Sequence, residues 1–433
     1  MITSFNMFKY LFNHVKLFSW ITTIYIHNKY YKKDIILYKC LLNSVLSCGC
    51  VPIKFIQWLI PYLYITLDKK DHYILELFKK TYENCNFHSF DKTEKIYYHT
   101  FKQNIHDDYT DIKGISSGSI GQVYRAMNKN NNKIYALKVL HPNVKWELFI
   151  TDYILCLLSF IFSIDQIVSF RINDFFEDFK KQADFLNEAN NLLFFYDKYK
   201  DNNYIKIPKL LKLSGDVLIM EYLEGDKIDN KLTFHNQYKY SVLFSSFCLN
   251  NLHILKTNHG DLHEGNFKIR GNHLIVYDFG YCWNNEENKN TLLLNEFITI
   301  FSHVNSFTYK EKLNIMLNIF VLINTDIKYK EEIIKSYNSY EINSPEEAIL
   351  FMIHFYKEKS LLLSIDTINL LLTYIHLQRY SGNTYYLEQY NYCKTNDIFH
   401  DYQEILKKSI IKYEDKKIKT NYDKFNHLKK YIQ

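Results

Sequence analysis

The stretch HGDLHEGN, residues 259–266, places an aspartate between two histidines and closes on an asparagine. The tetrapeptide YDFG follows at residues 277–280. The chain has only 11 glycines among 433 residues, yet three of them lie in these two segments. A glycine in such a chain is expected to serve the backbone, because it lacks a Cβ. Two tight, acid-bearing loops so close together therefore predict a site with carboxylate chemistry.

The two loops hold three side chains whose order has a chemical reason. Asp261 and Asn266 are five residues apart, and Asp278 follows an expected hairpin that turns at Gly271-Asn272. This is the protein-kinase order H-R-D-x-x-x-x-N then D-F-G, with Gly260 in place of the arginine. There, one carboxylate accepts the proton of the attacking hydroxyl, while the amide and second carboxylate hold Mg²⁺. We expect Asp261 as the catalytic base and Asn266 and Asp278 as metal ligands.

Upstream, SSGSIGQV at residues 116–123 fits the phosphate-loop pattern G-x-G-x-x-G-x-V, except that Ser116 replaces the first glycine. Such a loop lets backbone N–H groups approach phosphates closely. Taken alone, the stretch fits a plain hairpin equally well. As a nucleotide loop, it predicts contacts from Ser116, Gly118, Ser119, Gly121 and Val123.

Lys138, in ALKVL, stands where kinases place the strand lysine that pairs with the α- and β-phosphates. Glu188 is its candidate partner, and Asp184 is expected one helical turn earlier on the same face. A commonplace edge-strand lysine and a solvated helix face are the alternatives. The segment IMEYLEG predicts a hinge, in which backbone groups of Glu221 and Leu223 face the edge of an adenine.

The rest of the pattern predicts an α+β fold with two lobes, an antiparallel sheet followed by a helical half, and a cleft between them. Residues 112–140 predict two strands around the turn NKNNNK, and residues 146–200 and 238–257 predict helices. The expected divisions are an N-terminal segment (1–34), a helical extension (35–105), an N-lobe (106–225) with a helical insert (142–200), and a helical C-lobe with a basic tail (226–433).

Residues 1–33 contain no acid and five lysines, mixed with aromatic residues. Three interpretations stay open. The segment is a mitochondrial targeting sequence, although it lacks arginine, or a short membrane anchor at 10–26, although His14 and Lys16 interrupt it. In the third interpretation it is a helix that packs on the folded domain by its aromatic face.

Charge and cysteine content exclude other classes. A net charge of +6 is mild for this length, and no arginine-rich arm or aromatic platform indicates nucleic-acid binding. The eight cysteines form no C-x-x-C pair, and CGC at 48–50 is too tight for ordinary zinc spacing. We expect reduced thiols that pack as small hydrophobic residues.

Four features make the chain resemble the UbiB family, the atypical aarF-domain kinases linked to coenzyme Q. They are the loop SGSIGQVYRA, the stretch KVLHPNV at 138–144, the wide helical gap between Lys138 and Glu188, and KFIQW at 54–58, which resembles the K-x-G-Q signature. The resemblance covers roughly residues 40–310.

The resemblance implies a protein-kinase-like fold with a family-specific N-terminal helical extension, and an ATP- and Mg²⁺-dependent kinase or ATPase. It also implies that the K-x-G-Q helix covers the nucleotide cleft and occludes the protein-substrate groove, so that Lys54 and Gln57 project into the active site. Ile56 replaces the signature glycine, and Gln182 stands where a glutamate would pair with Lys54. Lys54 would then use Asp184 or a nucleotide phosphate.

Two other functions stay open. HGDLHEGN also suits a small-molecule kinase of the aminoglycoside or choline type, and a non-catalytic, nucleotide-gated scaffold could keep the same residues. The expected partners are a nucleotide, a lipid or quinone-like small molecule and a membrane surface, without nucleic acid. A mitochondrial or membrane-associated location is favoured over a cytoplasmic one.

Overall fold

The computed structural model describes residues 4–66, 69–83, 85, 87–162, 172–227, 234–263, 265–284 and 327–338, with short pieces between 351 and 373. Most of the expected helical C-lobe after 284, and its basic tail, lie outside the described residues. The described chain forms two compact units. The first holds residues up to 157, 176–189 and 210–222, and the second holds the described residues of 158–175, 190–209 and those from 223 onward.

Helices fill the N-terminal part of the first unit, as the sequence predicts for residues 35–105. They are α1 (Ser4–Tyr30), α2 (Ile35–Ser47), α3 (Cys50–Thr66), the 3₁₀ turn η1 (Lys69–Asp71), α4 (His72–Phe78), α5 (Lys80–Glu83), α6 (Phe90–Phe101) and α7 (Ile105–Asp108). Asp34 begins α2, because its carboxylate accepts a hydrogen bond from Ile36 N at 2.8 Å. Buried side chains such as Leu42, Ile53 and Ile74 join α2, α3 and α4 in one core.

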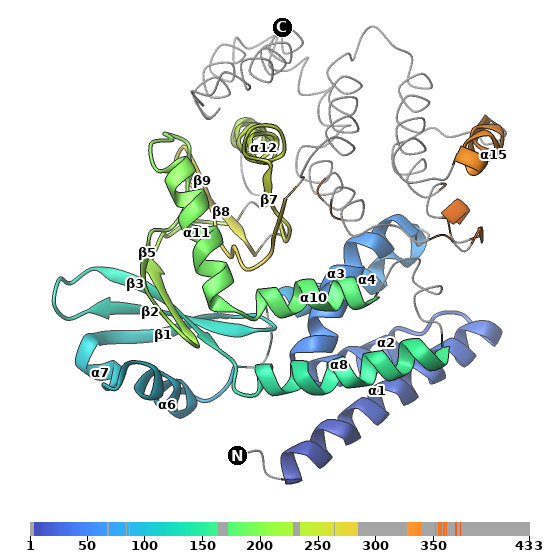
Figure 1. The fold of residues 1–433 in the computed structure, drawn as a ribbon, viewed down its shortest axis with the longest axis horizontal. Coiled ribbons are helices and arrows are strands. Elements are labelled where there is room, and N and C mark those ends of the chain that lie inside the picture. Colours follow the sequence, from blue (N-terminus) through green and yellow to red (C-terminus); the bar gives the residue numbers. More distant parts are fainter. Residues whose placement is uncertain are drawn as a thin grey trace, which may run out of the picture. The chain divides into compact units, whose positions relative to one another are not determined.

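The N-terminal segment forms the long helix α1, which packs on the first unit (Figure 1). Its buried stripe is Tyr10, Leu17 and Ile24, seven residues apart, and Tyr10 OH lies 2.9 Å from Thr151 Oγ1. The expectation of an aromatic packing face was wrong, because most aromatic residues of α1 are exposed, Phe12 and Tyr25 among them. No helix in the described part of the chain is long and apolar enough to span a membrane.

The first unit also contains an antiparallel five-stranded sheet, in the order β1-β2-β3-β6-β5. Its strands are β1 (Tyr109–Ser117), β2 (Gly121–Asn128), β3 (Ile134–Leu140), β5 (Leu210–Ser214) and β6 (Val217–Glu221). The turn at Gly215 and Asp216 joins β5 to β6, as the sequence predicts. Core residues under the sheet include Tyr97, Leu137 and Ile219.

Residues 109–140 form three strands rather than the two we expected. A tight turn separates β1 from β2, and Gly118 N donates to Gly121 O at 3.0 Å across it. Gly121 then lies so close to β3 that a Cβ would stand 2.6 Å from Val139 O. The break was missed because only residues 118–120 separate β1 from β2, so the whole stretch was taken as one strand.

The helical insert contains α8 (Val144–Phe162), α10 (Ile172–Gln182) and α11 (Phe185–Tyr199). We had expected Asp184 to share a helix face with Glu188, and this expectation was wrong. Asp184 lies immediately before α11, and its Oδ1 accepts a hydrogen bond from Leu186 N at 2.9 Å. Aspartate is favoured at this position because it satisfies an N–H group that has no partner within the helix.

The second unit contains two small sheets and the helix α12 (Phe234–Leu249). β4 (Ile205–Lys206), β9 (His273–Val276) and β8 (Phe267–Arg270) form one sheet, and β7 (Thr257–His259) pairs with β10 (Cys282–Asn284). The expected β8–β9 hairpin is confirmed, and Gly271 takes a φ of +56° in its turn. The helix expected at 238–257 is interrupted, because α12 passes into π-helical turns at Asn250–Leu255. A further helix, α15, spans Ile327–Asn338.

The described cysteines have the expected character. All six are free, and Cys48 and Cys50 are buried. Burial raises the pKa of both thiols, so they stay protonated and unreactive. Within the described residues, no cluster of three or more His, Cys, Asp or Glu side chains could hold a metal ion.

Candidate active site

Lys138 and Glu188 form a buried ion pair in the first unit. Lys138 Nζ on β3 lies 2.7 Å from Glu188 Oε1 and 2.8 Å from Oε2 on α11. The two side chains are only 10% and 2% exposed. The structure thus brings together the two residues that the sequence pairs, and both carboxylate oxygens face the same ammonium group. Buried charges of this kind are retained when they are paired in good geometry.

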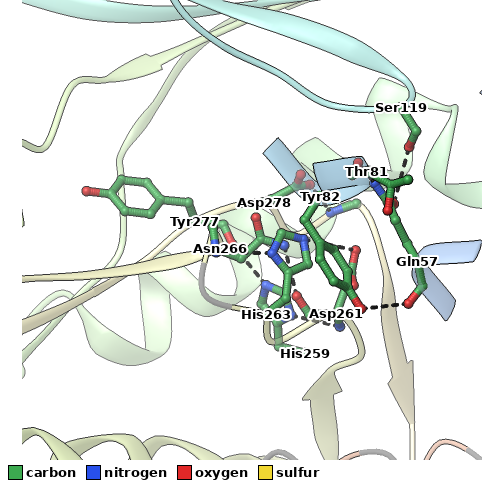
Figure 2. A network of polar contacts seen from close by, with 12 residues as sticks. Gln57, Thr81, Tyr82, Ser119, His259, Asp261, His263, Asn266, Tyr277 and Asp278 are labelled. Carbon is green, nitrogen blue, oxygen red and sulfur yellow. Dashed lines mark hydrogen bonds and ion pairs between the residues drawn. The ribbon is translucent and has the colours of Figure 1, made fainter. Parts of the chain in front are cut away.

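The predicted nucleotide loop occupies the end of β1, the β1–β2 turn and the start of β2. Ser116 is the last residue but one of β1, Gly118 and Ser119 lie in the turn, and Gly121 and Val123 lie at the start of β2. Figure 2 shows Ser119 beside Gln57, with Ser119 Oγ 3.5 Å from Gln57 Oε1. A glutamine of the N-terminal extension therefore contacts the tip of this loop.

Helix α3 presents Lys54 and Gln57 as buried side chains. Gln57 Nε2 donates to Thr81 O at 2.5 Å, and Tyr82 OH donates to the backbone carbonyl of Gln57 at 2.8 Å (Figure 2). Gln182, at the position of the missing glutamate, is also buried. The glutamine of the signature is thus held by backbone contacts that do not depend on the glycine that Ile56 replaces.

The loop that carries Asp261 is fixed by His259 in the second unit. His259 Nε2 lies 2.9 Å from Tyr277 O, and His259 Nδ1 accepts a hydrogen bond from Asp261 N at 3.2 Å. A carbonyl can only accept, so the imidazole carries its proton on Nε2. Burial lowers the pKa of His259, which keeps the ring neutral in this role. The histidine therefore ties the backbone of Asp261 to the residue before Asp278.

Asn266 faces the same loop through its amide. Asn266 Nδ2 donates to Asp261 O at 2.8 Å, as Figure 2 shows. Nearby, Gly265 N donates to His263 Nδ1 at 3.1 Å, so His263 carries a proton on Nε2. That Nε2 lies 3.9 Å from Asp261 Oδ2. With its nitrogen used by the backbone, Asn266 has its amide oxygen as the atom suited to a cation.

Asp278 has a φ of +55°, which is unusual for a residue other than glycine. Its Oδ1 accepts a hydrogen bond from Gly280 N at 3.3 Å. The next residue, Phe279, is held on both sides: Asn191 Nδ2 donates to its carbonyl at 2.9 Å, and its ring stacks on Phe195 at 4.8 Å. A residue whose neighbours hold its backbone in such an unusual conformation is typical of functional sites.

The expected hinge lies where the chain passes from the first unit to the second, between Tyr222 and Leu223. Glu221 ends β6. Leu223 O accepts a hydrogen bond from Tyr277 OH at 2.7 Å, so this carbonyl is already used by the protein. The Leu223 carbonyl, which was expected to face adenine, therefore already has a partner within the protein.

Gly260, in place of the kinase arginine, has a packing reason. A Cβ at this position would lie 2.5 Å from the ring of Tyr281. Sequence reasoning did not assign roles to His259, Tyr277 or Asn191. The sequence carried a signal only for His259, which is the first residue of the motif HGDLHEGN. Tyr277 and Asn191 act through contacts between distant segments, which the sequence does not display.

Comparison with known proteins places these residues in a family. The pattern of the ABC1 atypical kinase-like domain matches residues 80–310, which is more than half of the chain. The chain is 29% identical over 250 residues to the probable serine/threonine-protein kinase abkC of Dictyostelium discoideum, covering 54% of this chain and 35% of that protein.

Two further relatives carry organelle names. An uncharacterized aarF domain-containing protein kinase of Arabidopsis thaliana, described as chloroplastic, is 29% identical over 174 residues (38% of this chain, 24% of that protein). The mitochondrial ABC1 family protein YPL109C of Saccharomyces cerevisiae is 27% identical over 234 residues (47% and 36%). The chain thus spans about a quarter to just over a third of the length of these relatives.

The matched segment contains the antiparallel sheet, the ion pair of Lys138 and Glu188, and both acid-bearing loops. A mixed helix-and-sheet, kinase-like fold therefore agrees with the family pattern. The chain belongs to the ABC1 atypical kinase-like family, as the resemblance to aarF-domain kinases predicts.

Proposed function

We propose that this chain binds ATP with Mg²⁺ and either transfers the γ-phosphoryl group to an acceptor or hydrolyses it. In the transfer, the acceptor oxygen bonds to the γ-phosphorus as the bond to the β–γ bridging oxygen breaks. Asp261 takes the proton from the attacking hydroxyl or water, and ADP leaves. The family supports kinase-type chemistry, and the roles of the individual residues are our proposal.

The observation that carries this proposal is the ion pair of Lys138 and Glu188. A buried lysine held by both oxygens of one carboxylate is fixed in position, at 2.7 and 2.8 Å. In protein kinases this pair must be formed for the lysine to meet the α- and β-phosphates. Glu188 would thus position Lys138, and Lys138 would bind the nucleotide.

The residues proposed for the metal suit Mg²⁺ by their chemistry. Asn266 offers an amide oxygen because its nitrogen donates to Asp261 O, and Asp278 offers a carboxylate in a strained backbone. Mg²⁺ prefers oxygen ligands and is held by few protein groups together with phosphates. When bound, the ion would neutralise charge that develops on the phosphate oxygens.

Two alternatives predict different outcomes. A small-molecule kinase would share the nucleotide chemistry, and it would transfer phosphate to an aminoglycoside or choline-like hydroxyl. A nucleotide-gated scaffold would bind ATP without turnover. The long insert between Lys138 and Glu188 and the contact of Gln57 with Ser119 favour the aarF-type reading over the first of these.

Thermal unfolding with MgATP tests the binding. We expect MgATP to raise the midpoint of the full chain, because a ligand of the native state stabilises it. Asp278→Asn should lose most of that increase. The matched control is Asp197→Asn, on an exposed residue of α11 that forms a surface ion pair with Lys200. Equal stabilisation of the wild type, Asp278→Asn and Asp197→Asn by MgATP would contradict the proposed metal site.

Single-turnover hydrolysis then separates an enzyme from a scaffold. The full chain is mixed with a limiting amount of MgATP, with and without lipid vesicles and a quinone-like compound. Release of phosphate supports an ATPase or a kinase, and loss of release in Asp261→Asn assigns the base. Binding without any release would favour the scaffold.

We also propose that the protein works at an organelle membrane, with a lipid or a quinone-like molecule as partner. Relatives named chloroplastic and mitochondrial support the compartment. The exposed apolar side chains of α1 and its lysines support binding to a membrane surface. These are proposals about partners, and vesicle binding tests them.

A further inference from the structure

A continuous row of hydrogen bonds runs from β2 through α6, the segment before α6 and the residue after β3 to the β1–β2 turn. All of its members belong to the first unit. Gln122 Nε2 donates to Tyr124 OH, which lies 2.6 Å from Thr93 Oγ1. Thr93 Oγ1 lies 2.8 Å from His88 Nε2, His88 Nδ1 lies 2.8 Å from His141 Nδ1, and His141 Nε2 lies 3.0 Å from Gly118 O.

The position of every proton in this row follows from its last member. Gly118 O can only accept, so His141 must donate from Nε2. A neutral His141 then accepts at Nδ1, and His88 must donate from its own Nδ1. His88 Nε2 in turn accepts from the hydroxyl of Thr93, which leaves Tyr124 to donate to Thr93. With both imidazoles neutral, the row therefore has one direction.

Burial agrees with neutral rings. Burial first, and then electrostatic repulsion from the neighbouring His141 and Lys92, lower the pKa of His88 to about 4. Burial also lowers the pKa of His141. Two protonated Nδ1 atoms could not approach to 2.8 Å without repulsion, so the close contact itself needs one donor and one acceptor.

His141 controls two carbonyl groups of the nucleotide loop. Its Nε2 binds Gly118 O, and its backbone N–H donates to Ile120 O at 2.8 Å. In a trans peptide the carbonyl and the following N–H point in opposite directions, and the described chain has no cis peptide. The N–H of Ser119 is therefore directed away from His141. A phosphate loop binds anions through N–H groups turned outward in this way.

Gln122 of β2 and Thr93 of α6 hold His88 in place. Gln122 Oε1 accepts a hydrogen bond from His88 N at 2.9 Å, and Gln122 Nε2 approaches His88 O at 3.3 Å. Gln122 and Thr93 are fully buried. One glutamine of β2 therefore fixes the backbone of His88, while Thr93 fixes its ring.

We propose that His141 is a positioning residue of the nucleotide loop and that His88 sets its tautomer. His88 donates a hydrogen bond from its Nδ1–H to His141 Nδ1, so the proton of His141 stays on Nε2 and its hydrogen bond to Gly118 O orients the Gly118 peptide for phosphate binding. The inference rests on the proposed nucleotide function. It adds that the segment before α6 determines how the loop receives the phosphates of a nucleotide.

Matched variants of the full chain test this role. His141→Gln keeps an N–H donor near the position of Nε2, and His141→Met has a similar length without a donor. His88→Asn keeps a donor near Nδ1, and His88→Leu has the same size without one. Titration calorimetry measures MgATP and adenosine with each protein, since the loop should affect only the ligand with phosphates.

We expect His141→Met and His88→Leu to bind MgATP about tenfold more weakly, as one lost hydrogen bond allows. Their affinity for adenosine should equal that of the wild type, and Gln and Asn should restore MgATP binding. Wild-type MgATP affinity in folded His141→Met would overturn the proposal, and so would equal losses for adenosine, which indicate a structural role only. If the wild type binds adenosine and MgATP equally or neither, the proposed function fails and takes this proposal with it.

Nitrogen-15 spectra of the histidine side chains give a second measurement that needs no nucleotide. We expect His141 to be protonated on Nε2 and His88 on Nδ1 at neutral pH. In His88→Leu, His141 should become a mixture of tautomers. The opposite tautomers in the wild type would overturn the proposal whatever the nucleotide data show.

Discussion

The carboxylate of Glu147, on α8, accepts a hydrogen bond from the backbone N–H of Cys50, the first residue of α3, at 2.8 Å. The N–H groups at the start of a helix lack partners within the helix, so this contact anchors the helix that carries Lys54 and Gln57. Gly49 makes room for it: its φ is +100°, and a Cβ there would lie 2.3 Å from Glu147 Oε2. The CGC segment therefore serves this approach of two helices.

Replacement of Glu147 by Gln should remove a pH dependence of stability. Burial raises the pKa of Glu147, so the folded protein keeps this proton longer than the unfolded chain does. Stability from this group therefore falls as the pH rises above about 4.5 and through the folded pKa. Gln keeps an acceptor for Cys50 N, so Glu147→Gln should be at least as stable as the wild type at pH 7.5.

Urea unfolding at pH 4.5, 6 and 7.5 measures the effect. Glu147→Leu serves as the comparison, because it leaves Cys50 N without its acceptor and should cost about 1–3 kcal/mol at every pH. A loss of stability in Glu147→Gln that grows with pH would contradict the assignment.

The ion pair of Lys138 and Glu188 should show strong energetic coupling. Glu188→Gln and Lys138→Met each leave one buried charged group without its opposite charge, which typically costs about 3–5 kcal/mol. The double variant Lys138→Met/Glu188→Gln removes both charges and should cost much less than the sum. A double-mutant cycle by urea unfolding measures the coupling, and additive losses would mean that the pair is weak.

Nucleotide binding separates stability from function in the same variants. The double variant should be folded yet fail to gain stability from MgATP, because the lysine proposed to meet the phosphates is gone. Stabilisation by MgATP equal to that of the wild type would show that Lys138 has no part in binding.

Motif spacing predicted contacts between residues whose side-chain type is required for binding phosphate. Lys138 and Glu188 are fifty residues apart, yet they could be paired because a buried phosphate-binding lysine requires a carboxylate. The hairpin at Gly271 could also be predicted from the sequence, because glycine tolerates a positive φ. These features depend on residue type and local order, which a single sequence displays.

Contacts that depend on tertiary packing were not predictable. Tyr277 binds the Leu223 carbonyl across 54 positions, and any polar side chain could have done so. The tautomers of His88 and His141 follow from a row of partners in four separate segments. The short turn before Gly121 was missed as a boundary between two strands because it has only three residues, 118–120, although its glycines were noted.

Three histidines should make the protein less stable in mild acid. Burial lowers the pKa of His88, His141 and His259, so the unfolded chain takes up protons first as the pH falls. The unfolding free energy should therefore fall as the pH drops from about 6.5 toward the folded pKa, which for His88 is about 4.

His88→Asn isolates one contribution to this slope. Asn does not titrate, so the variant should lose less stability than the wild type between pH 7 and pH 5, where Lys92 and His141 oppose a charge on His88. Urea unfolding at the two pH values gives the difference. A steeper slope in the variant would contradict the neutral state of His88.

The contact between Gln57 and Ser119 should restrict the substrates of the enzyme. Because α3 holds the tip of the nucleotide loop, we expect the intact chain to transfer no phosphate to a generic basic-protein substrate above background. Gln57→Met removes the contact and should change the ratio of ATP to ADP affinity. Tyr82→Phe is the control, since it loosens the backbone of Gln57 without touching Ser119. Efficient phosphorylation of the basic protein by the wild type would contradict this.

The outward face of α1 should bind anionic membranes. Apolar residues recur on it every three or four positions, and the exposed ones are Phe8, Leu11, Phe12, Val15, Phe18, Ile21, Tyr25 and Ile26. The buried stripe of Tyr10, Leu17 and Ile24 fixes the opposite side on the protein. Five lysines among residues 1–33 would each contribute about 1 kcal/mol near an anionic leaflet, and aromatic rings suit the interface.

Co-sedimentation with vesicles of anionic lipid at low salt tests this face without deleting the helix. The triple variant Phe12→Gln/Phe18→Gln/Tyr25→Gln should bind at least about tenfold more weakly than the wild type, because each ring brings apolar area to the interface. The matched control is Tyr73→Gln/Phe87→Gln/Tyr98→Gln, which alters three exposed rings elsewhere and should bind like the wild type. Equal pelleting of both variants would move the membrane contact away from α1, and no pelleting of the wild type would leave α1 with a packing role alone.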